Sequence, residues 1–419
     1  MKSKIKIKTF GCKVNHYDSV LLQESLENQK ISSIDKKKIT ILNTCAVTSE
    51  AGKEARRQAA RIKKQDPKSL VVVTGCGAQV ETSLYEQSPS IDLVIANSHK
   101  KDLPDLLKNY SSLNQKVFKS NIFKTNTLYN NFISSEKERT RSFVKIQDGC
   151  NSFCTFCIIP FARGKSQSVP ISFLVESVKK LEDQGVQEVV LTGVHIGDYQ
   201  DGDKVFEDLV ESLLKETSIP RLRLSSLEPI ELTDRLLDLY QQERMCPHFH
   251  LSLQSANSQV LKSMKRKYSR KEVEKTFVKI SKKYPKAFVG MDVIAGFYSE
   301  SEKDFEETYE VLKNNSWTKM HVFPYSPRQG TYAYKYPSLS REEILRRAGL
   351  LRHLSDARFR VHSQQQIGTE KKVLIYKTNS QRGLSRDYWE IDLPQSSLKG
   401  EHAFKIKNFN KQTGRLIAD

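Results

Sequence analysis

The sequence lacks any long apolar stretch. Of its 419 residues, 38% are hydrophobic and 28% are charged, and no run of eighteen apolar residues occurs. A membrane-spanning helix is therefore not expected. The opening residues, MKSKIKIKTF, also lack the apolar segment of a signal peptide. We therefore expect a cytoplasmic protein that does not contact a membrane.

Cysteine is scarce, with seven residues in the whole chain. An odd number of cysteines in a reducing compartment does not indicate a disulfide framework, because the thiols of cytosolic proteins stay reduced. Metal binding or thiolate chemistry is the better interpretation of these residues.

Negative charge is in the minority. The chain has 49 Asp and Glu against 68 Lys and Arg, which gives a net charge of +19. Such a surplus favours a phosphate-rich partner, because basic side chains neutralise phosphate groups. The alternative is a basic protein without such a partner, since runs of lysine are often solvated surfaces.

The first part of the chain alternates apolar runs with helical stretches. This pattern predicts βαβ units and a doubly wound parallel sheet, in a domain that spans residues 1–125. The expected strands are 4–10, 38–44, 69–75 and 91–97, and the clearest expected helices are 16–28 and 49–66.

Three cysteines lie one or two residues past the ends of three expected strands: Cys12, Cys45 and Cys76. The carboxyl ends of parallel strands meet at one edge of a sheet, which is where open α/β sheets bind ligands. The three thiols, here called the strand-end trio, are therefore expected to meet at that edge. The alternative is three buried structural cysteines.

The rest of the chain predicts two further domains after a polar linker at about residues 100–141. Strands and helices alternate again over 136–366, and six βα units are too few for a closed eight-stranded barrel. An open, partial TIM-like barrel is therefore expected. Its strands are 142–148, 188–194, 221–227, 248–254, 288–296 and 320–326. Short β-like runs over 367–419 predict a small all-β barrel.

Three more cysteines lie close together in the segment DGCNSFCTFC: Cys150, Cys154 and Cys157, here called the loop trio. A zinc site normally has a fourth ligand at a paired spacing, but the first candidate, His195, comes much later. Three thiolates without a fourth ligand suit a 4Fe-4S cluster with one open iron. An open iron is a coordination site for a substrate or cofactor.

The C-x-x-x-C-x-x-C spacing, with Phe156 before the last cysteine, resembles the radical S-adenosylmethionine superfamily. The resemblance implies that the open iron chelates S-adenosylmethionine, which is reductively split into methionine and a 5'-deoxyadenosyl radical. The protein holds the cofactor and excludes water, while the cofactor carries the difficult chemistry.

Further segments extend the resemblance over nearly the whole chain. TFGCKVNHYDS, NTCAVT, VTGCGAQ, HLSLQSANSQVLKSMKRKYS and VFPYSPRQGTYA are similar to the methylthiotransferases of that superfamily. The resemblance implies a second 4Fe-4S cluster on the strand-end trio and a C-terminal TRAM-like barrel that binds tRNA. It also implies two S-adenosylmethionine molecules per turnover, one as methyl donor and one as radical source.

The resemblance also indicates a substrate. The first cysteine is followed by Lys13, Val14 and Asn15. This segment resembles the one found in the enzymes that insert a methylthio group at C2 of N6-threonylcarbamoyladenosine 37 of tRNA. The alternatives are N6-isopentenyladenosine 37 and an aspartate of a ribosomal protein. Some positions depart from the family pattern, among them Tyr298 and Ser299, which stand where a Pro-Gly turn is usual.

Weaker candidates lie at the ends of the barrel strands. With Phe156, the expected S-adenosylmethionine contacts are Ser225, Ser226, Glu228 and Gln254, although ordinary strand-end hydrogen bonding is the alternative. His195, His248, His250 and Asp292 are further candidates without an assigned role. Arg163 and Lys165 are expected either to meet phosphate or carboxylate or to be solvated, and Cys246 is expected to be inert.

The expected partners follow from this chemistry. They are tRNA, a low-potential electron donor of flavodoxin or ferredoxin type, and a sulfur donor, and the protein is expected to be a monomer. Two other classes remain open from the sequence. One is an RNA-binding protein whose cysteines hold a structural metal, and the other is an iron-sulfur electron carrier.

Overall fold

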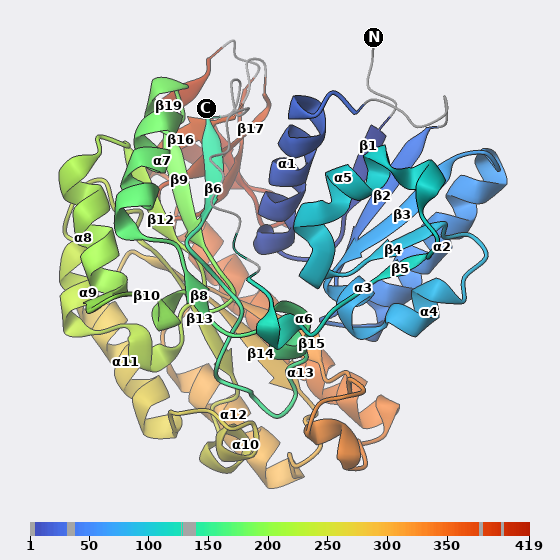
Figure 1. Cartoon of the computed structure of the whole chain (residues 1–419). Coiled ribbons are helices and arrows are strands. Elements are labelled where there is room, and N and C mark those ends of the chain that lie inside the picture. Colours follow the sequence, from blue (N-terminus) through green and yellow to red (C-terminus); the bar gives the residue numbers. More distant parts are fainter. Residues whose placement is uncertain (1–4, 32–37, 127, 129–139, 377–379, 395–397) are drawn as a thin grey trace.

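The computed structural model describes residues 5–31, 38–126, 128, 140–376, 380–394 and 398–419. Figure 1 shows a blue N-terminal sheet beside a green-to-orange partial barrel, with a red β-barrel behind. In the described part of the chain, no helix combines the length and the apolar character needed to cross a membrane.

The N-terminal domain is a five-stranded parallel sheet with helices on both faces, as expected. Its strands pair in sequence order: β1 (Ile5–Thr9), β2 (Ile39–Thr44), β3 (Leu70–Gly75), β4 (Leu93–Ile95) and β5 (Val117–Phe118). Helices α1 (Lys13–Asn28) and α5 (Leu103–Lys108) bury leucines against one face. Helices α2 (Ser49–Gln65), α3 (Cys76–Val80) and α4 (Thr82–Glu86) cover the other.

Two boundaries differ from the sequence expectation. Helix α1 begins at Lys13, directly after Cys12, and not at residue 16. The expected linker also starts too early, because Leu103 and Leu107 of α5 are fully buried in the N-terminal core and β5 pairs with β4. A strand or two was expected within this polar segment, but its composition concealed the helix α5. The expected start of the central domain, residue 136, lies outside the described residues.

The central domain has the six expected strands, arranged as two three-stranded parallel sheets. The first has the order β12 (Arg221–Leu224), β9 (Glu188–Thr192), β6 (Arg141–Lys145). The second has the order β13 (His248–Gln254), β14 (Phe288–Ala295), β15 (Lys319–Pro324). Isolated bridges such as Leu227 to Leu251 join the two sheets.

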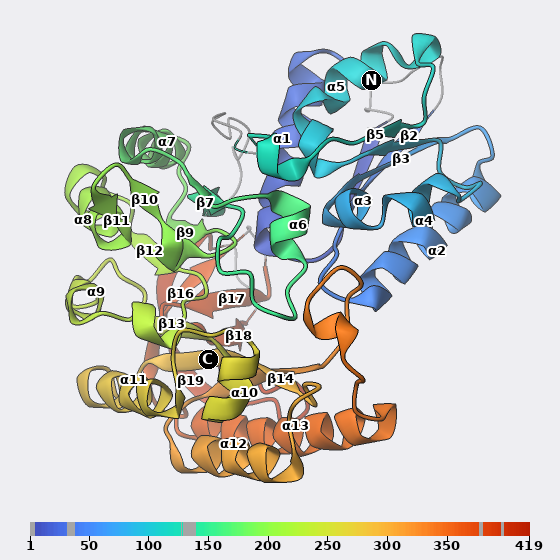
Figure 2. The ribbon, with the colours of Figure 1, turned by 60° about the horizontal axis from the view of Figure 1, so that its bottom comes forward.

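Helices surround the open barrel on its outer side (Figure 2). They are α7 (Ile171–Asp183), α8 (Phe206–Glu216), α9 (Asp234–Leu239), α10 (Ser258–Ser263), α11 (Arg270–Lys283), α12 (Glu302–Asn314) and α13 (Arg341–Gln364). Helix α6 (Ile159–Arg163) instead follows the loop trio and packs against α3 of the N-terminal domain. The antiparallel pairs β7 (Gln147–Asp148) with β8 (Gln167–Ser168), and β10 (Gln200–Asp201) with β11 (Lys204–Val205), flank the first sheet.

The C-terminal residues form the expected closed β-barrel. Its strands are β16 (Glu370–Ile375), β17 (Arg382–Ser385), β18 (Glu390–Asp392), β19 (Gly400–Phe409) and β20 (Leu416–Ala418). The guanidinium of Arg221, the first residue of β12, donates hydrogen bonds to the carbonyls of Leu384 and Ser385 at 3.1 Å. The small barrel therefore docks near the amino ends of the central strands and not at their carboxyl ends.

Candidate active site

The strand-end trio meets at the carboxyl edge of the N-terminal sheet, as expected. Cys12 precedes α1, Cys45 follows β2, and Cys76 is the first residue of α3. A Cβ atom on Gly11 would lie 2.6 Å from the Cys45 Sγ atom, so glycine allows the first strand to pass close to that thiol. Burial and the neighbouring Cys76 thiol raise the pKa of Cys45 to about 11.

Two asparagines frame the third thiol of this trio. The side-chain amide of Asn97 donates to the Cys76 Sγ atom at 3.6 Å and to the carbonyl of Ala162 in α6 at 2.9 Å. The Oδ1 atom of Asn15 lies 3.9 Å from the same sulfur. One amide therefore joins the strand-end trio to the segment that follows the loop trio.

The loop trio lies between β7 and α6, in a tightly folded segment. The backbone N–H of Cys157 donates to the carbonyl of Cys154 at 2.9 Å, and that of Cys150 donates to Gly164 at 3.1 Å. Gly149 has a φ of 72°, and a Cβ atom there would lie 2.0 Å from the Lys165 carbonyl oxygen. A glycine is therefore required where this loop folds back.

Charged side chains contact two thiols of the loop trio. The Arg266 guanidinium lies 3.5 Å from the Cys154 Sγ atom and 2.5 Å from a Glu228 carboxylate oxygen. His195 places Nδ1 3.8 Å from the Cys150 Sγ atom and Nε2 2.5 Å from Glu231. Burial opposes protonation of His195, but the hydrogen bonds to Cys150 and Glu231 outweigh it and raise its pKa to about 11.

The donor sets fit clusters better than single ions. Within the described residues, the only three candidate ligand atoms that lie within 4.8 Å of one another belong to His195, Glu228 and Glu231. The thiols of each trio are spaced more widely, whereas a single zinc ion holds its sulfur ligands about 2.3 Å away. Three thiolates at wider spacing match the donor set of an iron-sulfur cluster with a free corner.

A buried group of charges joins the two trios. The Arg163 guanidinium donates to Asp148 at 2.9 Å, to Asp18 of α1 at 3.0 Å and to Asn15 at 2.6 Å. Lys145 bridges the two carboxylates at 2.7 and 2.9 Å. All these side chains are buried. Burial alone would raise the pKa of Asp18, but the surrounding cations hold it well below its usual range.

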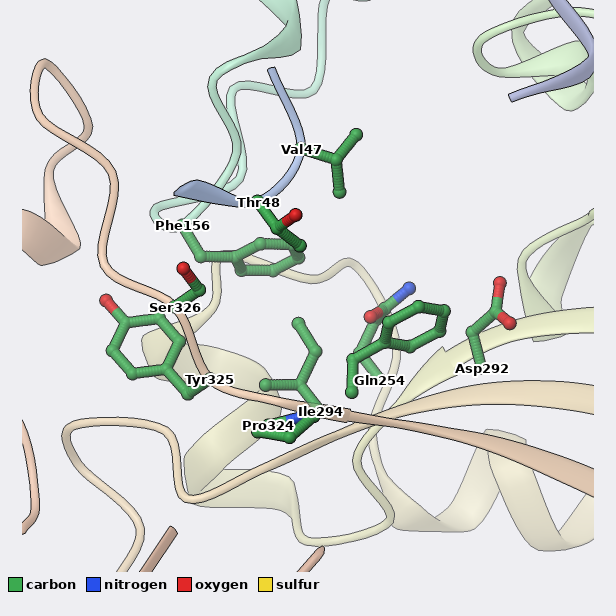
Figure 3. Close-up of a pocket in the computed structure, with 10 residues that line it drawn as sticks. Val47, Thr48, Phe156, Gln254, Asp292, Ile294, Pro324, Tyr325 and Ser326 are labelled. Atoms are coloured by element: carbon green, nitrogen blue, oxygen red, sulfur yellow. The ribbon is translucent and has the colours of Figure 1, made fainter. Parts of the chain in front are cut away.

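A cavity of about 220 Å³ opens between the neighbours of both trios. Val47 and Thr48 reach it from the segment after Cys45, and Phe156 reaches it from the loop trio (Figure 3). The remaining lining residues come from the ends of β13, β14 and β15: Gln254, Asp292, Ile294, Phe323, Pro324, Tyr325 and Ser326. One chamber is therefore lined by residues beside both trios.

The expected S-adenosylmethionine contacts fall in different surroundings. Phe156 and Gln254 line the cavity, and Gln254 has a φ of 64°, which turns the strand end. Glu228 pairs with Arg266 beside Cys154. Ser226 hydrogen-bonds His250 at 2.8 Å, while the backbone N–H of Ser225 makes an ordinary strand-end bond to Leu191.

The other candidates are also placed. Asp292 lines the cavity and lies 3.5 Å from His250, and burial raises its pKa to about 6. His248 is buried and stacks on Tyr388 of the C-terminal barrel, with ring centroids 3.8 Å apart, away from the cavity lining.

Cys246 is fully buried outside both trios. Arg163 meets carboxylates, whereas no ion pair is found for Lys165 among the described residues.

Sequence reasoning missed Asp18, Lys145 and Arg266. Lys145 had a visible signal, because a lysine inside the apolar strand SFVKIQD must find a buried counter-charge. Its partner Asp18 lies in another domain, so no local pattern could supply it. Arg266 stands in a run of basic residues that is typical of a solvated surface.

Comparisons with known proteins agree with this arrangement. Residues 144–312 match the Radical SAM superfamily, and residues 4–96 match the Uncharacterized protein family UPF0004. The radical S-adenosylmethionine class implies S-adenosylmethionine and a 4Fe-4S cluster as cofactors. TsrM from Kitasatospora setae, a radical S-adenosylmethionine methyltransferase with cobalamin and a [4Fe-4S] cluster bound, shares the fold. Its TM-score is 0.57 at 13% identity, over 78% of this chain and 77% of that one.

Curated relatives cover nearly the whole chain. The threonylcarbamoyladenosine tRNA methylthiotransferase MtaB of Aquifex aeolicus is 37% identical over 93% of this chain and 96% of its own length. The protein of that name from Rickettsia prowazekii is 36% identical over 89% and 88%. A tRNA-2-methylthio-N(6)-dimethylallyladenosine synthase from Thermodesulfovibrio yellowstonii is 31% identical over 81% and 80%. The chain therefore belongs to the radical S-adenosylmethionine methylthiotransferase family.

Proposed function

We propose that this enzyme inserts a methylthio group at C2 of N6-threonylcarbamoyladenosine 37 in tRNA. The observation that carries the proposal is a cavity that residues beside both thiol trios line together. Neither a base nor a nucleophile attacks an unactivated C–H bond, so the reaction needs a radical as well as a source of sulfur. Both reactive centres must therefore face the same substrate. The relatives with the threonylcarbamoyladenosine name support the substrate.

The loop trio would hold the cluster that binds S-adenosylmethionine, and the strand-end trio would hold a second cluster. When bound, these groups supply electron transfer, a methyl group, sulfur and radical chemistry, with two S-adenosylmethionine molecules used per turnover. The chain itself would hold these groups and shield them from water. Phe156 and Gln254 bound the space for the cofactor, and Arg266 places a positive charge beside Cys154 and Glu228.

The buried charges around Arg163 would fix the distance between the two reactive centres. Asp18 belongs to α1, which starts directly after Cys12, while Arg163 ends the short helix after the loop trio. Their ion pair at 3.0 Å ties the two thiol-bearing segments to each other. Misplacement by about 1 Å can cost a reaction 10²-fold, so this contact bears on the rate of sulfur insertion.

A positive charge near the cavity supports the threonylcarbamoyl side chain over the isopentenyl one. Lys13 directly follows Cys12. Burial and two nearby arginines lower its pKa to about 8, which leaves it mostly protonated at pH 7. Burial together with the Lys13 charge lowers the pKa of His250 to about 3. Burial raises the pKa of Asp292, a residue of the cavity lining, and the Lys13 charge partly offsets this rise. The threonylcarbamoyl group ends in a carboxylate that a lysine attracts, whereas the isopentenyl group is apolar.

The proposed partners follow from the reaction. They are tRNA, a low-potential electron donor and a sulfur donor, with the enzyme acting as a monomer. The surplus of nineteen positive charges supports tRNA binding, because phosphate neutralisation supplies most of the sequence-independent affinity. The small closed barrel would contribute backbone contacts to the RNA.

Nucleoside mass spectrometry of tRNA tests the function directly. In cells that lack this protein, we expect loss of 2-methylthio-N6-threonylcarbamoyladenosine and accumulation of its precursor. Loss of the methylthio derivative of isopentenyladenosine instead would move the substrate assignment to the other tRNA group. Unchanged nucleosides would contradict the proposal.

A further inference from the structure

Three exposed tyrosines lie in the loop between β15 and α13, in the sequence GTYAYKY. The exposed fractions are 53% for Tyr332, 50% for Tyr334 and 40% for Tyr336. Aromatic rings normally bury most of their surface or serve in recognition. Exposed rings gathered in one loop indicate that those among them that lie together form a contact surface.

The loop that carries these tyrosines is anchored both to the loop trio and to the N-terminal domain. The backbone N–H of Ala333 donates to the carbonyl of Thr155, inside the loop trio, at 2.8 Å. Arg328 reaches Glu81 of the N-terminal domain at 2.6 Å. In Figure 2 this orange segment extends toward the blue sheet. The rings are thus presented by a segment that both thiol-bearing regions hold in place.

Three neighbouring rings, two of them stacked and the third tilted by 53°, form the surface here called the tyrosine platform: Tyr298, Tyr332 and Tyr336. The rings of Tyr298 and Tyr336 stack with centroids 4.7 Å apart and planes 7° from parallel. Tyr332 lies 5.5 Å from Tyr336, and their hydroxyls hydrogen-bond at 2.7 Å. Tyr298 is the residue that stands where the family pattern has a proline, so this platform includes a ring that the usual turn lacks.

The platform continues the wall of the cavity. The Tyr298 ring contacts Phe297, with centroids 4.7 Å apart, and Phe297 contacts Phe156, which lines the cavity, at 6.2 Å. Tyr325, another lining residue, lies 5.1 Å from Phe297. A continuous row of rings therefore runs from the cavity to the exposed tyrosines.

We propose that the tyrosine platform stacks unpaired bases of the tRNA loop that flank the target adenosine. The inference rests on the proposed function, since it takes tRNA as the substrate. Unpaired bases stack on aromatic side chains regardless of their identity, because each base has a flat π-face. Lys335, whose ammonium lies 5.6 Å from the Tyr332 ring, offers a cation to the adjoining phosphates.

The test compares ring removal with ring retention. Tyr332→Ala combined with Tyr336→Ala should weaken binding of a tRNA anticodon stem-loop about tenfold or more. Tyr332→Phe with Tyr336→Phe keeps the rings and should bind within twofold of the parent enzyme. Tyr334→Ala is the matched control, because this exposed tyrosine has no ring contact among the described residues. Binding is measured by fluorescence anisotropy, with 2-aminopurine beside position 37 reporting stacking by its quenching.

The outcomes separate this inference from the proposed function. Each variant is also assayed for S-adenosylmethionine cleavage without RNA, which should remain unchanged if the fold is intact. If the parent enzyme gives no methylthio product on threonylcarbamoylated tRNA, the proposed function fails. If the parent is active while the double alanine variant binds and quenches like the parent, the platform has no role in base stacking. Equal weakening by the phenylalanine pair would also overturn the inference.

Discussion

The loop trio is held by one short segment, whereas the strand-end trio is assembled from the ends of three strands in a separate domain. The loop thiols have dedicated charged neighbours, Arg266 at Cys154 and His195 at Cys150. Charge reaches the other trio mainly from across the domain boundary, through Arg163. The first site is therefore local and self-contained, while the second depends on how two domains meet.

The largest expected effect comes from breaking the local site. Cys154→Ala should abolish both S-adenosylmethionine cleavage and methylthio transfer, because the loop trio has no spare thiol. We expect iron to fall from about eight to about four atoms per chain. The control is Cys246→Ala, which changes the one cysteine outside both trios. If cleavage persists in Cys154→Ala, the loop trio is not the site of radical formation.

The next effect comes from the domain contact beneath the strand-end trio. Asp18→Asn removes a buried negative charge that pairs with Lys100, Lys145 and Arg163. We expect the free energy of unfolding to fall by about 3–5 kcal/mol, measured by urea denaturation. In the enzyme that remains folded, methylthio transfer should decrease more than S-adenosylmethionine cleavage. Glu50→Gln, which breaks an exposed pair with Arg57, is the matched control. Equal losses in both activities would contradict this asymmetry.

A smaller effect is expected at Lys13, beside the strand-end trio. Lys13→Met should lower kcat/KM for threonylcarbamoylated tRNA about tenfold, which corresponds to about 1.4 kcal/mol. S-adenosylmethionine cleavage without RNA should remain, because the loop trio is untouched. Lys8→Met, at an exposed position of β1, serves as the control. Unchanged kcat/KM would mean that Lys13 does not recognise the substrate carboxylate.

The smallest effect near neutral pH is the beginning of a two-stage loss of stability in acid. Burial and nearby cations keep His248 neutral by lowering its pKa, whereas an unfolded histidine protonates below about pH 6.5. The unfolded state then binds more protons, so stability falls by about 1.4 kcal/mol per pH unit below that point. Asp18 has a lowered pKa, so its contribution is present above about pH 4 and is lost below it.

Variants separate the two stages in urea denaturation at a series of pH values. His248→Phe keeps a ring against Tyr388 and should reduce the first stage, leaving the share of His250, whose pKa is also lowered. Asp18→Asn should reduce only the second stage, to which Asp148 also contributes. If both variants follow the parent curve, these groups do not govern the acid response.

The same contrast explains what the sequence could predict. The loop trio follows from spacing alone, and the strand-end trio follows once the strands are recognised, because carboxyl ends of parallel strands meet at one edge. All six barrel strands were also predictable from their apolar runs. The buried pairing of Asp18 with Lys145 and Arg163 was not, because partners from different domains leave no periodic signal. The strand β17 leaves no such signal, because RGLS has too few apolar residues to stand out.

The most direct test of the account replaces Cys12, Cys45 and Cys76 together by alanine and measures iron, S-adenosylmethionine cleavage and tRNA modification in one anaerobic preparation. The account predicts about four irons per chain, continued formation of 5'-deoxyadenosine, and no methylthio product. About eight irons, or methylthio product from this variant, would contradict the central claim that each trio holds its own cluster.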